Sequence, residues 1–194
     1  MSRLSAVAVT GNLSAPSRSV VLARAALDAL AGLRDFDVRV IDLSSAGSAL
    51  VSAVRRADVE AQVADMLLAA ETADVLVAVT PVHRGSFTGL FKHYFDLLDG
   101  DALQDVPVIL GATSGSARHT LVVEYALRPL FAFFRAHTVP TALYAADADF
   151  DAGRTLLPAL QHRVAEAAEQ AVSLLVPRTP RTALSHPRVL RQGT

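Results

Sequence analysis

Short apolar runs alternate with longer stretches of amphipathic spacing along most of the chain. The apolar runs predict five β-strands, at residues 4–9, 37–42, 74–79, 106–112 and 139–144. Apolar positions at helical spacing predict five helices between and after them, at residues 17–31, 55–72, 87–98, 119–136 and 153–175. Gly32 is expected to close the first helix, and the Ser- and Gly-rich stretch 44–48 is expected to be a loop.

This alternation of strands and helices predicts an α/β fold. Residues 74–79 are apolar on both faces, which is typical of a central strand in a sheet that is covered on both sides. Parallel strands joined through helices need right-handed crossovers. We therefore expect a doubly wound, five-stranded parallel sheet with helices on both faces.

The segment Gly11–Ser19 joins the first strand directly to the first helix. Its hydroxyl and amide residues can gather backbone N–H groups at one point, where the helix dipole also favours an anion such as phosphate. The same residues are common in plain helix-capping loops, so both interpretations stay open. The glycine spacings of dinucleotide folds and of P-loop nucleoside triphosphatases are absent. Five strands with a phosphate loop after the first suit the flavodoxin-like order 2-1-3-4-5.

Two further loops carry unusual residues, and the expected strand order brings them to the same edge of the sheet. Thr80–Phe87 combines a proline, a glycine and several side-chain donors. Thr113–His119 has small residues that let backbone amides approach a flat ring. Together with the first loop they outline a site for a planar ligand with a phosphate tail, and flavin mononucleotide (FMN) is the candidate.

The composition of the chain limits which partners and which cellular compartment we expect. The chain has 194 residues, of which 52% are hydrophobic, a formal net charge of −1 and a pI near 6.6, so we expect neither a nucleic acid nor a membrane as partner. It has no cysteine, which excludes disulfides and thiolate chemistry and is compatible with the cytoplasm. Its start lacks the features of a signal peptide, which also favours a cytoplasmic protein. No spacing of His, Asp or Glu suggests a metal site.

The chain divides into one domain, at residues 1–175, and a C-terminal tail at residues 176–194. The tail contains four Arg and three Pro and no acidic residue. Because proline interrupts helices and little apolar surface is available to bury, we expect an extended or disordered segment. Contact with a neighbouring subunit or an acidic partner is the alternative.

Three motifs in order give the chain a recognisable family resemblance. They are Ser17-Arg18-Ser19, then Thr80-Pro81-Val82 continuing through residues 86–92 and 95–98, then residues 112–116 with His119 and residues 124–129. Over roughly residues 4–175 the chain resembles the NADPH-dependent FMN reductases. Its strongest likeness is to the reductases of two-component alkanesulfonate monooxygenase systems.

The resemblance implies hydride transfer from NADPH or NADH to FMN, release of reduced FMN to a partner flavin-dependent monooxygenase, and a homodimer or homotetramer. It implies no catalytic side chain, because the stacked rings of the two cofactors carry the chemistry. The implied cofactor-binding residues are Gly11, Asn12, Ser17, Arg18 and Ser19 in the phosphate loop, Pro81, Val82, His83, Arg84, Ser86 and Phe87 beside the flavin ring, and Thr113, Ser114, Gly115, Ser116 and His119 in the second wall.

The chain departs from the family pattern at two places. Relatives commonly have Gly-Ser-x-Arg where this chain has Gly11-Asn12-Leu13-Ser14, so that an amide replaces a hydroxyl and one guanidinium is missing. Arg84 and Arg118 are the cations that we consider as replacements. His83 stands where relatives often have Tyr after Pro-Val.

Residues 119–136 are more apolar than one buried helix face requires. Burial in the core and a homo-oligomer interface both stay open as explanations. Tyr125 matches a position that lies in a π-helical bulge in some sulfonate-linked relatives, and the sequence does not decide whether such a bulge is present here.

Two other functions remain to be weighed. One is a reductase that holds FMN tightly and passes electrons to a quinone, an azo dye or another acceptor. The other is a flavodoxin-like electron carrier without nicotinamide turnover. Such carriers are usually strongly acidic, so the near-neutral charge of this chain disfavours the second alternative.

Overall fold

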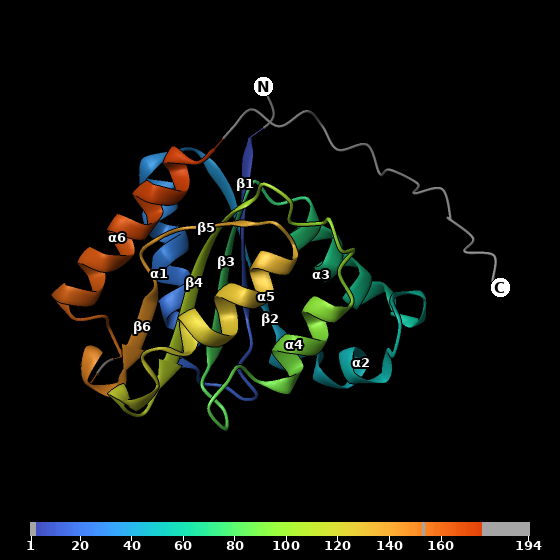
Figure 1. Cartoon of the computed structure of the whole chain (residues 1–194), viewed down its shortest axis with the longest axis horizontal. Helices are drawn as coiled ribbons and strands as arrows, with labels where there is room; N and C mark the ends of the chain where they lie inside the picture. The colour runs from blue at the N-terminus through green and yellow to red at the C-terminus, as the bar shows by residue number, and fades with distance from the viewer. Residues whose placement is uncertain (1–2, 153, 176–194) are drawn as a thin grey trace.

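A parallel sheet forms the centre of the molecule in the computed structural model, which describes residues 3–152 and 154–175 (Figure 1). The predicted tail at 176–194 lies outside the described residues. The strands are β1 (Leu4–Thr10), β2 (Phe36–Asp42), β3 (Val75–Pro81), β4 (Pro107–Ser114), β5 (His137–Thr138) and β6 (Leu143–Ala146). Their order is β2-β1-β3-β4-β5, with β6 also paired to β4, and every pairing is parallel. The predicted flavodoxin-like order is confirmed.

The fifth predicted strand is divided in two, so its prediction as one continuous run is wrong. β5 pairs with the start of β4 and β6 pairs with its end. Pro140 lies in the interruption and has no N–H to donate, which is tolerated at a sheet edge. Side chains serve the freed backbone groups: Arg128 Nη1 donates to the Val139 carbonyl at 3.1 Å, and the Thr141 N–H donates to Gln170 Oε1 at 2.9 Å.

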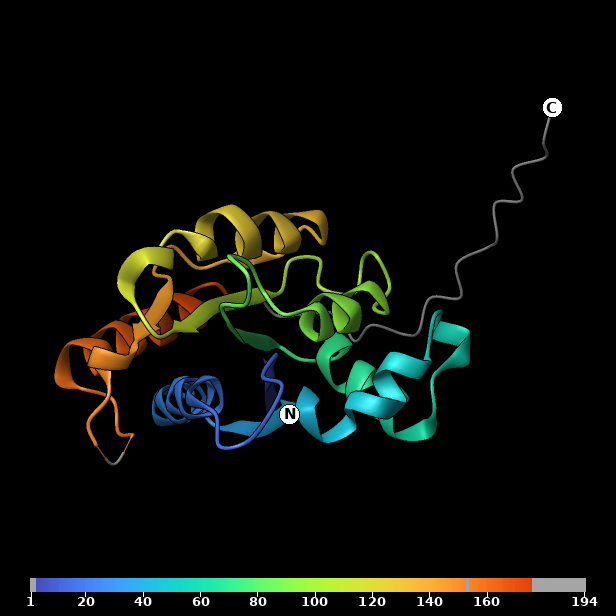
Figure 2. The same ribbon diagram turned by 90° about the horizontal axis from the view of Figure 1, so that it is seen from below.

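Helices cover both faces of the sheet, as predicted (Figures 1 and 2). One face carries α1 (Arg18–Leu33) and α6 (Pro158–Ser173). The other face carries α2 (Gly47–Ser52), α3 (Ala61–Glu71), α4 (Gly89–Asp96) and α5 (Arg128–Phe133). Short 3₁₀ turns, η1 (Leu43–Ala46), η2 (Arg56–Asp58), η3 (Ala117–His119) and η5 (Asp147–Asp149), and one π-helix, η4 (Val123–Leu127), complete the described elements.

Several helix boundaries differ from the predictions for local reasons. The 44–48 stretch is helical, because the Asp42 carboxylate caps η1 by accepting from the Ser44 N–H at 2.9 Å and Leu43 and Leu50 are buried. The last helix begins at Pro158, which fits the first turn of a helix, and not at 153. The first helix runs through Gly32 to Leu33.

The predicted helices at 55–72 and 119–136 are each broken. The first becomes η2 followed by α3, and the second becomes η3, the π-helix η4 and α5. Within the described residues, no helix combines the length and the hydropathy needed to cross a bilayer.

Candidate functional site

The loops after β1, β3 and β4 meet at the carboxyl edge of the sheet around a cavity of about 350 Å³. It is lined by Asn12, Leu13, Ser14, Pro16, Ser17, Arg18, Ser19, Pro81, Val82, His83, Thr88, Thr113, Ser114, Gly115 and Arg154. Most of the predicted site residues are therefore brought together. The structure leaves Gly11, Arg84, Ser86, Phe87, Ser116 and His119 outside the lining.

The start of α1 forms one end of the cavity. The Ser17 hydroxyl caps the helix by accepting from the Ser19 N–H at 3.2 Å. The Ser19 and Thr113 hydroxyls lie 2.7 Å apart in a buried hydrogen bond, which ties this loop to the end of β4. Both serines are thus engaged in positioning the loop, and the first-turn N–H groups of α1 are the donors that an anion would meet.

Gly11 serves packing inside this loop. A Cβ atom there would lie 2.7 Å from Phe91 Cβ and 2.9 Å from Thr80 Oγ1, so no larger residue fits. The Gly11 carbonyl accepts from the Thr88 hydroxyl at 2.7 Å. The absence of a side chain at position 11 therefore lets α4 approach the end of β1. The space beside Gly11 is filled by Phe91 and Thr80, so the glycine is explained by packing within the protein and not by a ligand.

Asn12 carries the clearest sign of a ligand. Its side chain is buried, at 3% exposure, and Nδ2 donates to the Ser14 carbonyl at 3.2 Å and to Ser44 Oγ at 3.3 Å. Oδ1 has no hydrogen-bond partner among the described residues. A flipped amide would set Oδ1 against the Ser14 carbonyl, so the contacts fix this orientation. A buried acceptor without a donor is costly, and a ligand hydroxyl group would satisfy it.

The loop after β3 folds back as a tight turn. His83 and Ser86 exchange two backbone hydrogen bonds, at 2.8 and 3.1 Å, and the two residues between them, Arg84 and Gly85, have φ of 53° and 82°. This conformation suits Gly85 and leaves Arg84 exposed at the tip of the turn. The Val82 N–H donates to the Thr113 carbonyl at 2.7 Å, which joins the two walls of the cavity.

Three residues that the sequence assigned to the walls do not line the cavity. Two of them, Phe87 and Ser116, contact other parts of the protein instead, and the third, His119, is exposed. The Phe87 ring lies 6.0 Å from the Phe91 ring and packs against the core. The Ser116 carbonyl accepts from the Tyr144 hydroxyl at 2.5 Å. His119 ends η3 on the exposed surface.

Two arginines approach the phosphate loop from different directions. Arg18 Nη1 lies 2.6 Å from Asp147 Oδ1, and its guanidinium lies 5.9 Å from the centre of the Phe150 ring. Arg154 comes from the segment between β6 and α6 and lines the cavity, and it forms no ion pair with any described residue. Sequence reasoning missed Arg154 by placing it inside the last helix. Pro158, a typical first residue of a helix, was the available signal that the helix begins later.

The π-helix that the sequence left undecided is present at residues 123–127, directly after the second wall. Leu121, Tyr125 and Phe133 on this stretch are 57%, 78% and 70% exposed, whereas Leu127 and Phe131 are buried. Residues 119–136 therefore combine a buried stripe with an exposed apolar one.

An ion pair spans the π-helix and α5. The Glu124 carboxylate accepts from Arg128 Nε and Nη2 at 2.6 and 2.9 Å. The hydrogen bonds from Arg128 lower the pKa of Glu124. Across residues 3–152 and 154–175, no group of three or more His, Asp or Glu side chains is placed to hold a metal ion.

The chain is similar to flavin reductases over nearly its whole described length. The family model for NADPH-dependent FMN reductase matches residues 4–151. The chain is 44% identical to "FMN reductase (NADPH)" of Pseudomonas aeruginosa, over 87% of this chain and 90% of that one. It is also 44% identical to "NADH-dependent FMN reductase SfnF" of Pseudomonas fluorescens, over 90% of this chain and 94% of the other.

A solved structure is also similar to this chain. The crystal structure of an oxidoreductase from Corynebacterium diphtheriae superimposes with a TM-score of 0.80 at 36% identity, and the match covers 92% of this chain and all of that one.

Proposed function

The chain belongs to the NADPH-dependent FMN reductase family, and we propose that it is a member that releases its product, supplying reduced FMN to a separate flavin-dependent monooxygenase. The enzyme is an NAD(P)H:FMN oxidoreductase, like the relatives that share 44% of its sequence. Among these relatives are enzymes named for NADPH and for NADH, so similarity alone does not assign the coenzyme. We further propose the cytoplasm as its location, in keeping with a cysteine-free chain.

The residues of the cavity fit FMN. We assign the phosphate to the N–H groups at the start of α1, with Arg154 as the nearby cation. The ribityl chain supplies hydroxyl groups, one of which can donate to Asn12 Oδ1, the buried acceptor that has no protein donor. We assign the flavin ring to the space between the 81–83 and 113–115 segments.

The bound flavin supplies the redox chemistry, by accepting hydride from a stacked nicotinamide. The role of the protein is to hold the ligands in place. The hydrogen bonds between Ser19 and Thr113 and between Val82 and Thr113 fix the three loops relative to one another. A hydride transfer of this kind needs no acid or base side chain. Among the described residues, His83 is the one histidine that lines the cavity, and we assign it a contact role at the edge of the ring.

The Arg18–Asp147 ion pair is the observation that supports an exchangeable flavin. A carboxylate 2.6 Å from the guanidinium compensates the charge that a phosphate would otherwise meet. The cavity is also small, at about 350 Å³, and its lining includes exposed residues such as Leu13 and His83. A weakly cationic, open site suits a flavin that must leave after each turnover.

Oxidation of NADPH and NADH at 340 nm, with and without added FMN, tests this function. We expect turnover that requires free FMN and saturates with it. Turnover that persists on flavin retained through purification, with electrons passing to a quinone or azo acceptor, would instead support the tight-binding alternative. Retained flavin with no oxidation of either coenzyme would contradict a reductase.

We also propose that the exposed apolar stripe of Leu121, Tyr125 and Phe133 forms a homo-oligomer interface. These side chains are exposed on one helical stretch, residues 121–133, and exposed apolar surface is typical of association sites. Light scattering after gel filtration tests the idea. Phe133→Glu should lower the particle mass, whereas the matched change Val54→Glu, at a position that is 80% exposed elsewhere, should not.

A further inference from the structure

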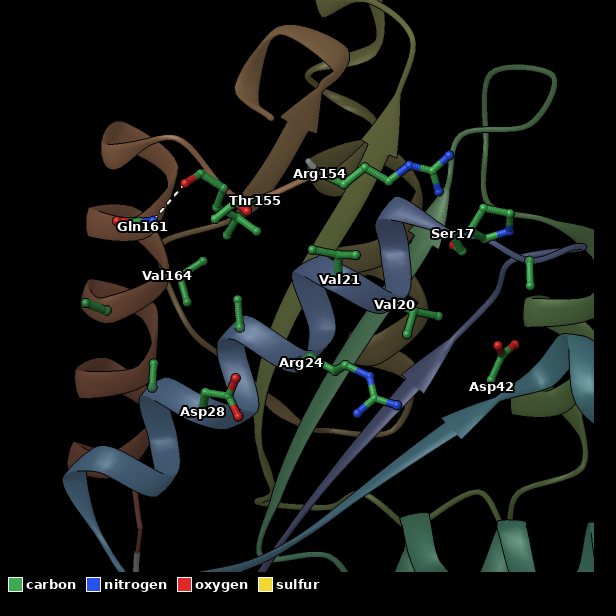
Figure 3. A pocket seen from close by; sticks show the side chains of 16 residues that line it. Ser17, Val20, Val21, Arg24, Asp28, Asp42, Arg154, Thr155, Gln161 and Val164 are labelled. Atoms are coloured by element: carbon green, nitrogen blue, oxygen red, sulfur yellow. Dashed lines mark hydrogen bonds between the residues drawn. The ribbon is translucent and has the colours of Figure 1, made fainter. Parts of the chain in front are cut away.

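A chain of side-chain hydrogen bonds leads from the end of β2 to the wall of the cavity assigned to FMN. Asp42, the last residue of β2, is half-buried, and its carboxylate is directed toward the loop that follows β1 (Figure 3). Asp42 Oδ1 accepts from the Ser44 hydroxyl at 2.7 Å and from the Ser44 N–H at 2.9 Å. Ser44 Oγ in turn accepts from Asn12 Nδ2 at 3.3 Å. The chain therefore joins a carboxylate to the amide that lines the cavity.

Asp42 and Ser44 themselves lie outside the lining of the cavity assigned to FMN. Asp42 lines a second cavity instead, of about 750 Å³, which follows the outer side of α1 (Figure 3). Neither residue is placed to touch a ligand in the first cavity. An effect of either side chain on such a ligand has to pass through Asn12.

The hydrogen bonds of this chain run in a fixed direction. An ionised carboxylate only accepts, so the Ser44 hydroxyl directs its single proton toward Asp42. Ser44 Oγ then faces Asn12 with lone pairs, which need an N–H. The Ser14 carbonyl also accepts from Asn12 Nδ2, at 3.2 Å. Both amide protons of Asn12 are thereby engaged, and Oδ1 is left without a donor among the described residues.

An Asn12 side chain held in this way offers a ligand an acceptor and no donor. Such a group attracts a ligand hydroxyl and repels a phosphate oxygen, which is itself an acceptor. A reversed amide would present Nδ2 and would attract the phosphate instead. The orientation of one amide thus decides which part of a flavin nucleotide can lie beside Asn12.

We propose that Asp42 and Ser44 are positioning residues of the flavin site, which fix the Asn12 amide so that Oδ1 accepts from a ribityl hydroxyl group. The proposal rests on the proposed function, because that function supplies FMN as the ligand. The same orientation keeps the phosphate away from Asn12 and leaves it to the N–H groups at the start of α1.

Fluorescence titration of FMN into the full chain, without coenzyme, tests the positioning role in a double-mutant cycle. Ser44→Ala removes an acceptor of Asn12 Nδ2, and we expect FMN to bind roughly three- to tenfold more weakly. Asp42→Ala lets the Ser44 hydroxyl turn its proton toward the amide and should weaken FMN similarly. Asn12→Ala removes the amide and should weaken FMN at least as much. In the Asn12→Ala background, neither Ser44→Ala nor Asp42→Ala should weaken FMN further, because both act only through the amide.

Two matched variants and a second flavin serve as controls. Ser44→Thr keeps the hydroxyl and should bind FMN within about twofold of wild type. Ser45→Ala removes a neighbouring hydroxyl of η1, which donates to the Asp42 carbonyl at 2.7 Å, and should also stay within about twofold. Riboflavin keeps the ribityl chain and lacks the phosphate. It should therefore be weakened by Ser44→Ala by the same factor as FMN.

The other outcomes contradict the proposal in distinguishable ways. Equal FMN affinity in wild type, Ser44→Ala and Asp42→Ala would overturn it. Losses that add to the loss in Asn12→Ala would also overturn it, because they would show that the two residues support the loop and not the amide. A loss for FMN that riboflavin does not share would assign the effect to the phosphate and overturn it as well.

The reductase function can fail separately from this proposal. Wild type that binds no flavin would overturn both. Wild type that binds FMN and shows the expected cycle, and yet oxidises neither NADPH nor NADH, would support the positioning role and contradict only the reductase function.

Discussion

The two faces of the sheet are packed with side chains of different size: small aliphatic residues on one face and aromatic rings on the other. Between the sheet and α1 and α6, the buried side chains are largely alanine, valine and leucine, and both helices are regular over sixteen residues. On the other face, a cluster of phenylalanine rings fills the space under α4 and α5. Phe95 is its centre, with ring centroids of Phe91, Phe131 and Phe134 at 4.7, 4.9 and 6.4 Å.

The difference shows how packing and backbone regularity are related in this protein. Small side chains let two regular helices pack close to each other and to the sheet. Large rings fill the space on the opposite face, which carries a π-helix, 3₁₀ turns and short helices. The cavity that we assign to flavin lies where the two faces meet, with Arg154 supplied by one and the Thr88 end of α4 by the other.

Removing the central ring should produce the largest effect. Phe95→Ala deletes a side chain that is 1% exposed and leaves a cavity among four other aromatic residues. We expect the free energy of unfolding to fall by about 3–5 kcal/mol. Urea denaturation measures it, with Leu68→Ala, at a position 57% exposed on α3, as the control expected to lose under about 1 kcal/mol. Similar losses in both variants would show that the aromatic cluster has no special role.

The alanine-filled face should respond to added volume. Ala167 is fully buried in the core that α1, α6 and the sheet share, and Ala167→Leu must displace its neighbours or force strained rotamers. The expected destabilisation is about 1–3 kcal/mol. Ala165→Leu makes the same change at an exposed position of the same helix and should stay within about 0.5 kcal/mol. If Ala167→Leu is as stable as wild type, the close packing of α6 through small side chains does not determine the structure of this face.

Substitution of Arg154, at the edge of the proposed flavin site, should change the affinity for FMN and have little effect on the free energy of unfolding. Arg154 has a φ of 64°, which asparagine tolerates, so Arg154→Asn removes the cation without new backbone strain. Losing one charge near the phosphate should raise the KM for FMN roughly three- to tenfold, about 0.7–1.4 kcal/mol. Arg135→Asn is the matched control, because Arg135 has a φ of 56° and lies outside both cavities. An unchanged KM in Arg154→Asn would assign the phosphate to the helix N-terminus alone.

The regular face and the irregular face also differ in how far the sequence predicts them. The run Leu4–Val9 and the cap at Ser17 specify β1 and the start of α1, and the strand order follows from the alternation. The π-helix is not visible in the spacing of residues 119–136, because the same apolar residues are compatible with an α-helix and with a π-helical turn.

The candidate site, too, could be predicted only in part from the sequence. The loops after β1, β3 and β4 are identified from their residue types, since the fold brings the ends of these strands together. Arg154 comes from a fourth segment whose position depends on where α6 begins. The unpartnered Asn12 Oδ1 depends on contacts with Ser14 and Ser44, which the sequence alone does not reveal.

The smallest expected effect concerns the ion pair that spans the π-helix and α5. Glu124 is held in its charged form by Arg128, which lowers its pKa from about 4.5, so the pair adds stability above that pH and loses it as the pH falls through the lowered value. The Glu124 side chain is 43% exposed, so Glu124→Gln should cost only about 0.5 kcal/mol at pH 7. Urea midpoints of the two proteins should converge as the pH is lowered below 4.5 and through the lowered pKa of Glu124. A gap that persists in acid would mean that the effect of Glu124→Gln does not come from the carboxylate charge, because both side chains are then uncharged and have the same shape.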